Sequence, residues 1–222
     1  MTVASPSTPR GRATRERIIR AAAELVAEHG VAAVSLDDVG ARARASRSQL
    51  YHYFDDKEAL IRAVVDATSD AVLDAQDELL EHIDSWAGLD RWFSALVELQ
   101  YQRQARGGCP IGSLAGQLAE RDPQTRGAIA DGLGRWEAGI REGLVRMRDR
   151  GKLSPDADPA ALATATMAAL QGGLLLTQVR RDPEQLRIAL DAARTVLRTH
   201  RVGSERRVHG DRPSTRSGAR RP

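Results

Sequence analysis

The stretch Ser35–Lys57, SLDDVGARARASRSQLYHYFDDK, has the pattern of two short helices separated by a tight turn. Ser35 is the expected N-cap of the first helix, and Asp38, three residues later, completes a weak capping box. Ser46 and Gln49 have the same spacing and form a clearer box at the start of the second helix. The expected inward faces follow helical spacing: Leu36, Val39 and Ala43 in the first helix, and Leu50, Tyr53 and Phe54 in the second.

Two helices of about two turns each bury too little surface to be stable alone, so a third helix must cover them. The segment Thr14–His29 supplies it, and Gly30 is the expected stop. Its apolar residues Ile18, Ala22, Leu25 and Val26 share one face. This order of helices is a helix-turn-helix, in which the second short helix enters the DNA major groove. The polar side chains that this helix would turn outward are Arg47, Ser48, Gln49, Tyr51 and His52.

The same residues carry a family resemblance. The run LYHYF, followed by DDKEAL and preceded by a V-x3-A-x2-S pattern over Val39–Ser46, resembles the N-terminal domain of TetR/AcrR-family transcriptional regulators. The resemblance covers about Arg12–Val65. Members of the family usually carry glycine in the turn and in the first turn of the following helix, where this chain has Arg44 and Ser48. Arg44 must therefore adopt whatever backbone conformation the turn requires.

The resemblance implies DNA contacts for four side chains. Tyr51 and His52 match positions that touch the DNA backbone and thymine methyl groups. Lys57, one of only two lysines in the chain, matches a lysine that anchors a phosphate. Ser35 would add a contact from the N-terminus of the first short helix.

Two further side chains have alternative interpretations. Gln49 would either pair with adenine or only close its capping box, and Arg47 would either read guanine or bind phosphate. One helix reads few bases, so we expect a homodimer on an inverted-repeat operator in double-stranded DNA. The expected DNA-binding residues are Ser35, Arg47, Ser48, Gln49, Tyr51, His52 and Lys57.

Composition and charge place the chain among globular proteins. Of 222 residues, 41% are apolar and 28% charged. Residues 1–53 hold 8 arginines against 5 acids (8 − 5 = +3), 54–199 hold 18 basic against 23 acidic residues (18 − 23 = −5), and 200–222 hold 7 arginines against 2 acids (7 − 2 = +5). We expect disordered segments at 1–11 and 201–222, where the basic tail would either attract DNA or do nothing measurable.

The sequence also suggests a location. A single cysteine gives no disulfide framework. The N-terminus lacks the apolar core of a secretory signal. We expect no uncharged apolar run of the roughly 18 residues that span a membrane. These features predict a cytoplasmic protein without a membrane partner.

After the helix-turn-helix domain, expected over 12–55, a larger helical domain is expected over 56–200. It would begin with one long helix from Asp56 to Ile83, a break at Gly88 and a helix over Leu89–Gln104. Three Asp-Pro pairs predict later helix starts. The expected helices begin at Pro123, ending near Gly151, at Pro159, and at Pro183, ending near His200.

The helix from Pro159 is apolar or small on all sides, which indicates burial against both its own core and a second subunit. Gly172 and Gly173 would permit close approach. We expect this helix and the last one to form a four-helix dimer interface.

The glycine-rich stretch Ala105–Ser113 allows three interpretations. A phosphate-binding loop lacks the Lys-Ser/Thr pair of a P-loop. A reactive Cys109, as nucleophile or redox sensor, lacks a nearby histidine. The third interpretation is a loop with a buried thiol. The run GCPIGSLA also resembles a subgroup of the same family, in which this loop borders the ligand-binding region.

The expected fold is therefore all-α, with an N-terminal helix-turn-helix domain and a larger domain for ligand binding and dimerisation. The resemblance implies a repressor released by a hydrophobic or aromatic small molecule, whose binding shifts the spacing of the two DNA-binding helices. An activator or a ligand-independent regulator of the same fold is the alternative, and a Cys109-based enzyme a remote one. No cofactor or metal site is expected, because the histidines lack ligand spacing. The expected ligand contacts are Trp92, Leu96, Leu114, Gln117, Trp136, Met167 and Gln171.

Overall fold

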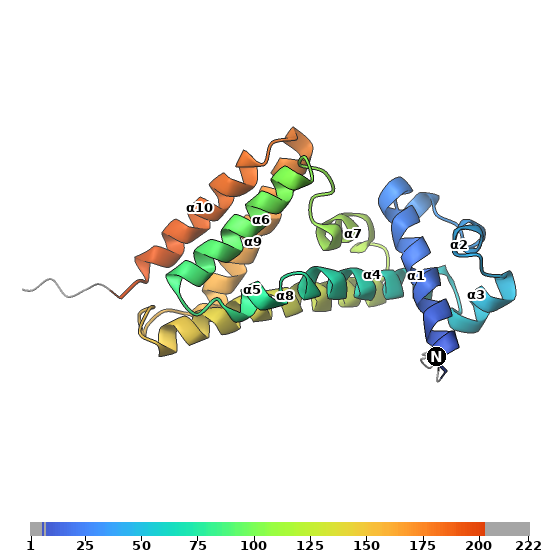
Figure 1. Cartoon of the computed structure of the whole chain (residues 1–222), viewed down its shortest axis with the longest axis horizontal. Coiled ribbons are helices and arrows are strands. Elements are labelled where there is room, and N and C mark those ends of the chain that lie inside the picture. The colour runs from blue at the N-terminus through green and yellow to red at the C-terminus, as the bar shows by residue number, and fades with distance from the viewer. Residues whose placement is uncertain (1–5, 7, 203–222) are drawn as a thin grey trace, which may run out of the picture.

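The computed structural model describes residue 6 and residues 8–202, and this part of the chain folds into helices without a β-strand (Figure 1). One isolated bridge pairs Leu153 with Arg201. The elements are α1 (Pro9–His29), η1 (Val31–Ala33), α2 (Leu36–Ala43), α3 (Arg47–Tyr53), α4 (Lys57–Asp74), α5 (Asp77–Glu81), α6 (Trp86–Gln102), α7 (Pro110–Leu118), α8 (Pro123–Asp149), α9 (Pro159–Arg180) and α10 (Glu184–Thr199).

The helices form two groups joined by long elements. In Figure 1, α1, α2 and α3 lie at one end, and α6, α9 and α10 lie side by side at the other. Helices α4 and α8 pack against each other and run between the two groups, with α7 beside α4 and α8. Ile140, Leu144 and Met147 on α8 are completely buried, so this helix lies at the core of the larger domain.

The first helix starts earlier than expected. Thr8 is its N-cap and its hydroxyl accepts a hydrogen bond from the Gly11 amide at 3.1 Å, so α1 already runs from Pro9. Proline is favoured in the first turn because its missing amide would have no partner there. The expected disordered segment 1–11 is thus wrong for residues 9–11. Residues 1–5 and 7, and 203–222 of the expected tail, lie outside the described residues.

The turn between α2 and α3 brings the two helices into close contact. Arg44 ends α2 in the left-handed conformation (φ 49°, ψ 46°), the conformation that glycine adopts without strain. A Cβ on Gly40 would lie 3.1 Å from the Ala45 carbonyl oxygen and 3.1 Å from Leu50 Cδ1. The expected inward residues are buried or partly buried, with Leu50 and Phe54 almost inaccessible.

The expected long helix over 56–83 is wrong, because the chain breaks after Asp74. Gln76 donates from Nε2 to the Val72 carbonyl oxygen at 3.0 Å and accepts a hydrogen bond from Trp92 Nε1 at 2.9 Å. The contact with α6 therefore fixes the bend. It lets α5 turn onto α8, where Gly143 leaves room for Ile83.

Two further boundaries differ from expectation. Gly88 does not interrupt a helix but lies inside α6, where it donates to the hydroxyl of the N-cap Ser85 at 3.1 Å. A side chain at Gly88 would clash with the carbonyl of His82. The stretch expected as a loop over 105–113 already becomes helical at Pro110, with Cys109 as the N-cap of α7.

The Asp-Pro pairs behave in two ways. Asp122 and Asp158 are N-caps, and their carboxylates accept hydrogen bonds from the amides two and three residues later. The Thr125 hydroxyl and amide hold the pKa of Asp122 below its ordinary value. At the third pair Pro183 is itself the N-cap, although Asp182 still accepts from the Glu184 amide at 3.0 Å.

Helices α9 and α10 pack closely along their length. A Cβ on Gly173 would lie 2.9 Å from Ala189 Cβ, whereas one on Gly172 would meet nothing within 4 Å. By length and composition α9 could cross a membrane, with a mean hydropathy of 1.4, and this corrects the expectation that no such run exists. Part of the helix, 44% of the apolar window, is buried against the rest of the chain.

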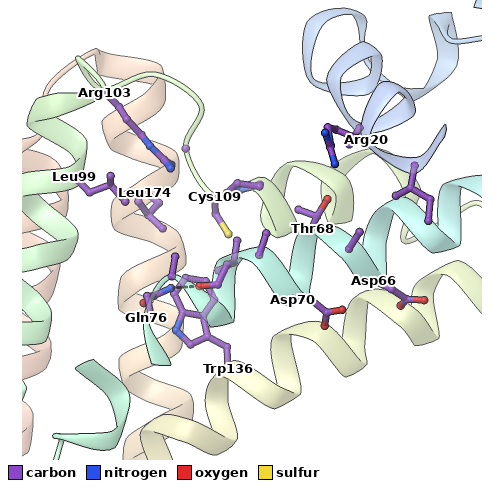
Figure 2. A pocket seen from close by; sticks show the side chains of 18 of the residues that line it. Arg20, Asp66, Thr68, Asp70, Gln76, Leu99, Arg103, Cys109, Trp136 and Leu174 are labelled. Atoms are coloured by element: carbon purple, nitrogen blue, oxygen red, sulfur yellow. Dashed lines mark hydrogen bonds between the residues drawn. The ribbon is translucent and has the colours of Figure 1, made fainter. Parts of the chain in front are cut away.

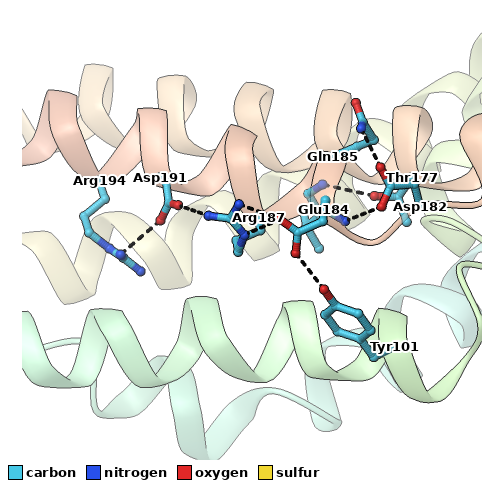
Figure 3. A network of polar contacts seen from close by, with 9 residues as sticks. Tyr101, Thr177, Asp182, Glu184, Gln185, Arg187, Asp191 and Arg194 are labelled. Carbon is cyan, nitrogen blue, oxygen red and sulfur yellow. Dashed lines mark hydrogen bonds and ion pairs between the residues drawn. The ribbon is translucent and has the colours of Figure 1, made fainter.

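A polar network joins α10 to α6 along one side (Figure 3). The Tyr101 hydroxyl donates to Glu184 Oε1 at 2.6 Å, and Arg187 bridges Glu184 and Asp191, with Nε 2.6 Å from Glu184 Oε2. Arg194 donates to Asp191 at 3.0 Å. Two of the contacts cross between the helices, because Arg194 also pairs with Asp90 on α6, with Nε 2.8 Å from Oδ1. The charged residues of α10 thus face α6, and its opposite side carries uncharged residues.

Candidate functional site

Helix α3 carries a polar face that no other part of the described chain covers. Its inward residue Leu50 is 2% exposed, whereas Tyr51 is 47% exposed. The seven-residue helix α3 is therefore amphipathic: its inward side is buried in the core, and its hydrogen-bond donors and the Tyr51 ring face solvent. The outward residues predicted from the sequence are all exposed: Arg47, Ser48, Gln49, Tyr51 and His52.

Two of the predicted DNA-contacting side chains already take part in capping boxes. Gln49 Oε1 accepts from the Ser46 amide at 2.9 Å, and the Ser46 hydroxyl accepts from the Gln49 amide at 3.2 Å. The Ser35 hydroxyl accepts from the Asp38 amide at 3.2 Å and donates to the Asp38 carboxylate at 2.5 Å. Gln49 Oε1 is therefore held by the capping box, while a bidentate adenine contact uses both amide atoms.

Arg47 and Tyr51 lie one turn apart on α3 and contact each other. The Arg47 guanidinium lies 5.8 Å from the centre of the Tyr51 ring, and its hydrogen bond with Tyr51 raises the pKa of Arg47 further. His52 packs edge to face with Tyr53, with 4.8 Å between ring centres. Arg47, Tyr51 and His52 are exposed, so α3 presents a cation and two rings outward.

Helix α1 holds α2 in place from behind. Arg17 Nε donates to the Ala43 carbonyl oxygen, the end of α2, at 2.8 Å. Arg42 on α2 makes a two-pronged ion pair with Glu28, at 3.1 and 2.9 Å, and this bond holds the pKa of Glu28 below its ordinary value. Several contacts therefore determine the position of α2 relative to α1, and α3 packs in turn against α2.

Lys57 is the first residue of α4 and lies directly after the exposed face of α3. The preceding Asp56 caps the helix, with Oδ1 2.6 Å from the Ala59 amide nitrogen. Lys57 is half-buried. It thus combines a positive charge with the positive end of a helix dipole, an arrangement that attracts anions.

A cavity of about 730 Å³ lies between the helix-turn-helix and the larger domain (Figure 2). Its size is in the range of small-molecule sites. Helices α1, α4, α6, α8 and α9 and the start of α7 contribute to its wall. Burial and the neighbouring Asp70 raise the pKa of Asp66, which lies on this wall. Because α1 also covers α2, one helix contacts both the cavity and the DNA-binding unit.

The structure divides the predicted ligand residues into three groups. Leu96 and Trp136 line the cavity. Leu114 and Gln117 instead line a second cavity of about 460 Å³ beside α1. The walls of these two cavities do not include Trp92, Met167 and Gln171, although Gln171 lies next to Cys109 and Gly112.

Gln117 makes a direct contact with the DNA-binding unit. Its Oε1 accepts a hydrogen bond from the Val31 amide at 2.9 Å, which ties α7 to the segment between α1 and α2. Helix α7 begins beside the main cavity, at Cys109 and Pro110. A shift of α7 would therefore reach the DNA-binding unit through this bond.

Two glutamines in the wall were not among the predicted ligand residues. Gln76 is hydrogen-bonded to Val72 through Nε2 and to Trp92 through Oε1. Gln100 is 2% exposed, and its Oε1 has no hydrogen-bond partner among the described residues. Its position continues the inward spacing of Trp92 and Leu96 by one turn, and a polar residue in an apolar stripe was the available signal.

The surroundings of Cys109 favour a structural role for its thiol over a reactive one. Cys109 is 6% exposed, and its Sγ accepts from the Gly112 amide at 3.3 Å. Burial raises the pKa of its thiol, which disfavours the thiolate that a nucleophile requires. Within the described part of the chain, no three His, Cys, Asp or Glu side chains come together as a metal site.

Comparison with known families covers both groups of helices. Residues 18–64 match the family described as bacterial regulatory proteins, tetR family, and residues 85–193 match the tetracyclin repressor-like C-terminal domain. The chain belongs to the TetR family. It is a DNA-binding transcriptional regulator of this family.

Individual transcriptional regulators are similar to this chain over about two thirds of its length or more. The transcriptional regulator AcuR of Cereibacter sphaeroides is 29% identical over 181 residues, covering 80% of this chain and 82% of AcuR. The regulator UidR of Escherichia coli K12 is 30% identical over 151 residues, covering 66% of this chain and 72% of UidR. A TetR-family crystal structure from Cytophaga hutchinsonii has the same fold, with a TM-score of 0.74 and 16% identity over 89% of this chain and all of that one.

Proposed function

We propose that this regulator is a repressor that binds an inverted-repeat operator as a homodimer and is released by a small, largely apolar ligand. The exposed polar face of α3 carries the proposal. Arg47, Tyr51 and His52 project from a helix whose opposite side is anchored in a core. That is how a helix-turn-helix presents its second helix to the major groove.

We assign distinct roles within this surface. Lys57 and Arg47 neutralise phosphates, while Tyr51 and His52 contact the backbone and thymine methyl groups. Ser48 and the Nε2 group of Gln49 donate to base edges. Ser35 contributes through the N-terminus of α2, because its hydroxyl is engaged with Asp38.

The proposed dimer forms through α9 and α10. Exposed positions on α9 between Ala161 and Val179 carry no charge, and Leu175 and Val179 are 60% and 72% exposed. Ile188 on α10 is 56% exposed. Exposed apolar surface of this extent favours a partner, and pairing two copies here would make a four-helix bundle.

The main cavity supports the proposal that a ligand releases the regulator from DNA. An occupant would touch Ile19 and Ala23 on α1 together with Leu96 on α6 and Leu174 on α9. A ligand that binds better to one arrangement of these helices shifts the population toward it and changes the spacing of the two α3 helices. Operator affinity falls by that difference in binding free energy.

Selection from a random duplex library tests the proposal. The recovered sequences should contain two related half-sites in inverted orientation, bound by one dimer. Sequences without two-fold symmetry would contradict the dimeric mode of reading. Lack of any preferred sequence would contradict the role of α3.

The two lysines of the chain provide a matched test of the interface. We expect Lys57→Ala to weaken binding to all duplexes and to reduce the slope of log affinity against log salt by about one per protomer. Lys152→Ala removes the same charge at an exposed site far from α3 and should leave both unchanged. Tyr51→Ala should also weaken binding. Equal affinities for all four proteins would place the interface elsewhere.

A further inference from the structure

The wall of the main cavity contains two buried polar atoms of opposite hydrogen-bonding character. Gln100 Oε1 is an acceptor, and Trp136 Nε1 carries a donor hydrogen. Both residues line the cavity and are 2% exposed, and neither atom has a hydrogen-bond partner among the described residues. Figure 2 shows Trp136 at the cavity, near Cys109 and Gln76.

A second glutamine and a second tryptophan close by show that the fold can satisfy such groups. Trp92 Nε1 donates to Gln76 Oε1 at 2.9 Å, and Gln76 Nε2 donates to the Val72 carbonyl oxygen. A glutamine and a tryptophan are thus hydrogen-bonded to each other in one case, whereas Gln100 Oε1 and Trp136 Nε1 have no partner among the described residues. Leaving a buried donor or acceptor without a partner is unfavourable, so the unpaired atoms indicate a missing group.

We infer that the effector is a neutral, mainly apolar molecule with one hydroxyl group, or a primary amide, that bridges Gln100 and Trp136. This inference rests on the proposed ligand-binding function. A hydroxyl both donates and accepts, so one such group satisfies both atoms. A carboxylate cannot donate to Gln100 Oε1, and a hydrocarbon satisfies neither atom.

The other residues of the cavity wall determine the shape and polarity of the rest of the effector. Ile19, Leu96, Leu99 and Leu174 give apolar contacts, and the volume of about 730 Å³ accommodates a two-ring compound. Because both polar atoms are buried within the wall, their side chains must rotate slightly to reach the bound group. Rotation of a terminal carboxamide is easy, since its torsion is broad.

Three probes of the same shape separate the two hydrogen bonds. They are 2-naphthol, which donates and accepts, 2-methoxynaphthalene, which only accepts, and naphthalene, which does neither. Their dissociation constants are measured by calorimetry on the full chain at matched cosolvent. We expect 2-naphthol to bind at least tenfold more tightly than naphthalene, with 2-methoxynaphthalene between them.

Variants assign each of the two differences in probe affinity to one residue. Gln100→Leu should abolish the advantage of 2-naphthol over 2-methoxynaphthalene, and Trp136→Phe should abolish that of 2-methoxynaphthalene over naphthalene. Gln102→Leu makes the same change at an exposed position on α6, outside the cavity wall, and should change neither ratio. The probe comparison on the unaltered protein needs no variant to fold.

Several outcomes would overturn the inference. Equal affinity of the three probes, no binding of any of them, or a 2-naphthol preference that persists in Gln100→Leu would each do so. Operator binding is measured on the same protein without probes. If the operator is bound while all probes fail, the inference alone is wrong. If no operator is bound, the proposed function fails separately.

Discussion

Arg44 shows how a single residue can keep a turn that glycine would form more easily. It ends α2 in the left-handed region, with φ 49°. This conformation brings a side chain's Cβ close to the following carbonyl oxygen, at a cost of about 1–2 kcal/mol. Arg44 is exposed, and the turn that it forms positions α3.

We therefore expect Arg44→Gly to raise the free energy of unfolding by about 0.5–1 kcal/mol, since relief of strain exceeds the added entropy of the unfolded glycine. Arg181→Gly is the matched comparison, with φ 54° and a hydrogen bond from Nη1 to the Ala105 carbonyl oxygen at 3.2 Å. Loss of that bond should reduce its gain. Urea denaturation measures both, and a destabilised Arg44→Gly protein would contradict this account.

Asp66 makes stability depend on pH in an unusual direction for a carboxylate. Its pKa is raised, so the folded state binds the proton more tightly than the unfolded state does. Its contribution is favourable below the ordinary value of 3.8 and is lost as the pH rises through the raised value. At neutral pH the ionised side chain therefore destabilises the fold.

Asp66→Asn should raise the free energy of unfolding at pH 7, measured by urea denaturation, by less than about 1 kcal/mol, because the side chain still contacts solvent. The gain should shrink as the pH approaches 3.8. Asp74→Asn, at an exposed position of the same helix outside the cavity, is the control. A gain that is independent of pH between 4 and 8 would exclude the explanation.

At the scale of elements, α8 carries glycines with opposite packing. A Cβ on Gly143 would lie 2.6 Å from Ile83 Cβ and 2.7 Å from the Ile83 carbonyl oxygen, so the segment that follows α5 packs directly onto this glycine. A Cβ on Gly134 would meet nothing within 4 Å. The same substitution should therefore have opposite effects at these two positions.

We expect Gly143→Ala to lower the free energy of unfolding by about 1–3 kcal/mol through overpacking. Gly134→Ala should raise it by about 0.5–1 kcal/mol, because alanine favours the helix. Thermal and urea unfolding give both values. Destabilisation by both alanines would mean that helix packing does not decide the result.

The elements also show what the sequence could and could not predict. Capping boxes at Ser35 and Ser46 and the inward face of α3 depend on residues three or four apart, and these predictions are confirmed. The break after Asp74 depends on a bond between Gln76 and Trp92, 16 residues apart. The cavity beside Gln100 is formed by helices far apart in the sequence, so no local pattern could locate it, although the polar residue in the apolar stripe of α6 was a local signal for Gln100 itself.

At the scale of the whole molecule, the uncharged side of α9 and α10 should control assembly. Leu175→Glu places a charge at the centre of the proposed dimer interface, where burial without a partner is strongly unfavourable. We expect monomers at micromolar concentration and at least a tenfold loss of operator affinity. Light scattering after size exclusion and fluorescence anisotropy measure the two effects.

Ser94→Glu adds the same charge to an exposed position of α6 and should remain dimeric. A dimeric Leu175→Glu protein would place the subunit interface elsewhere. A monomeric protein that retains full operator affinity would instead remove the need for two copies on one operator.

The position of α1, which forms part of the cavity wall and also covers α2, has a consequence for measurements on the regulator in solution. If an effector weakens duplex binding by a given factor, thermodynamic linkage requires the duplex to weaken effector binding by the same factor. Excess operator DNA therefore weakens binding of the effector to the regulator. Titrating effector into the operator complex, or operator into the effector complex, must yield the same coupling constant.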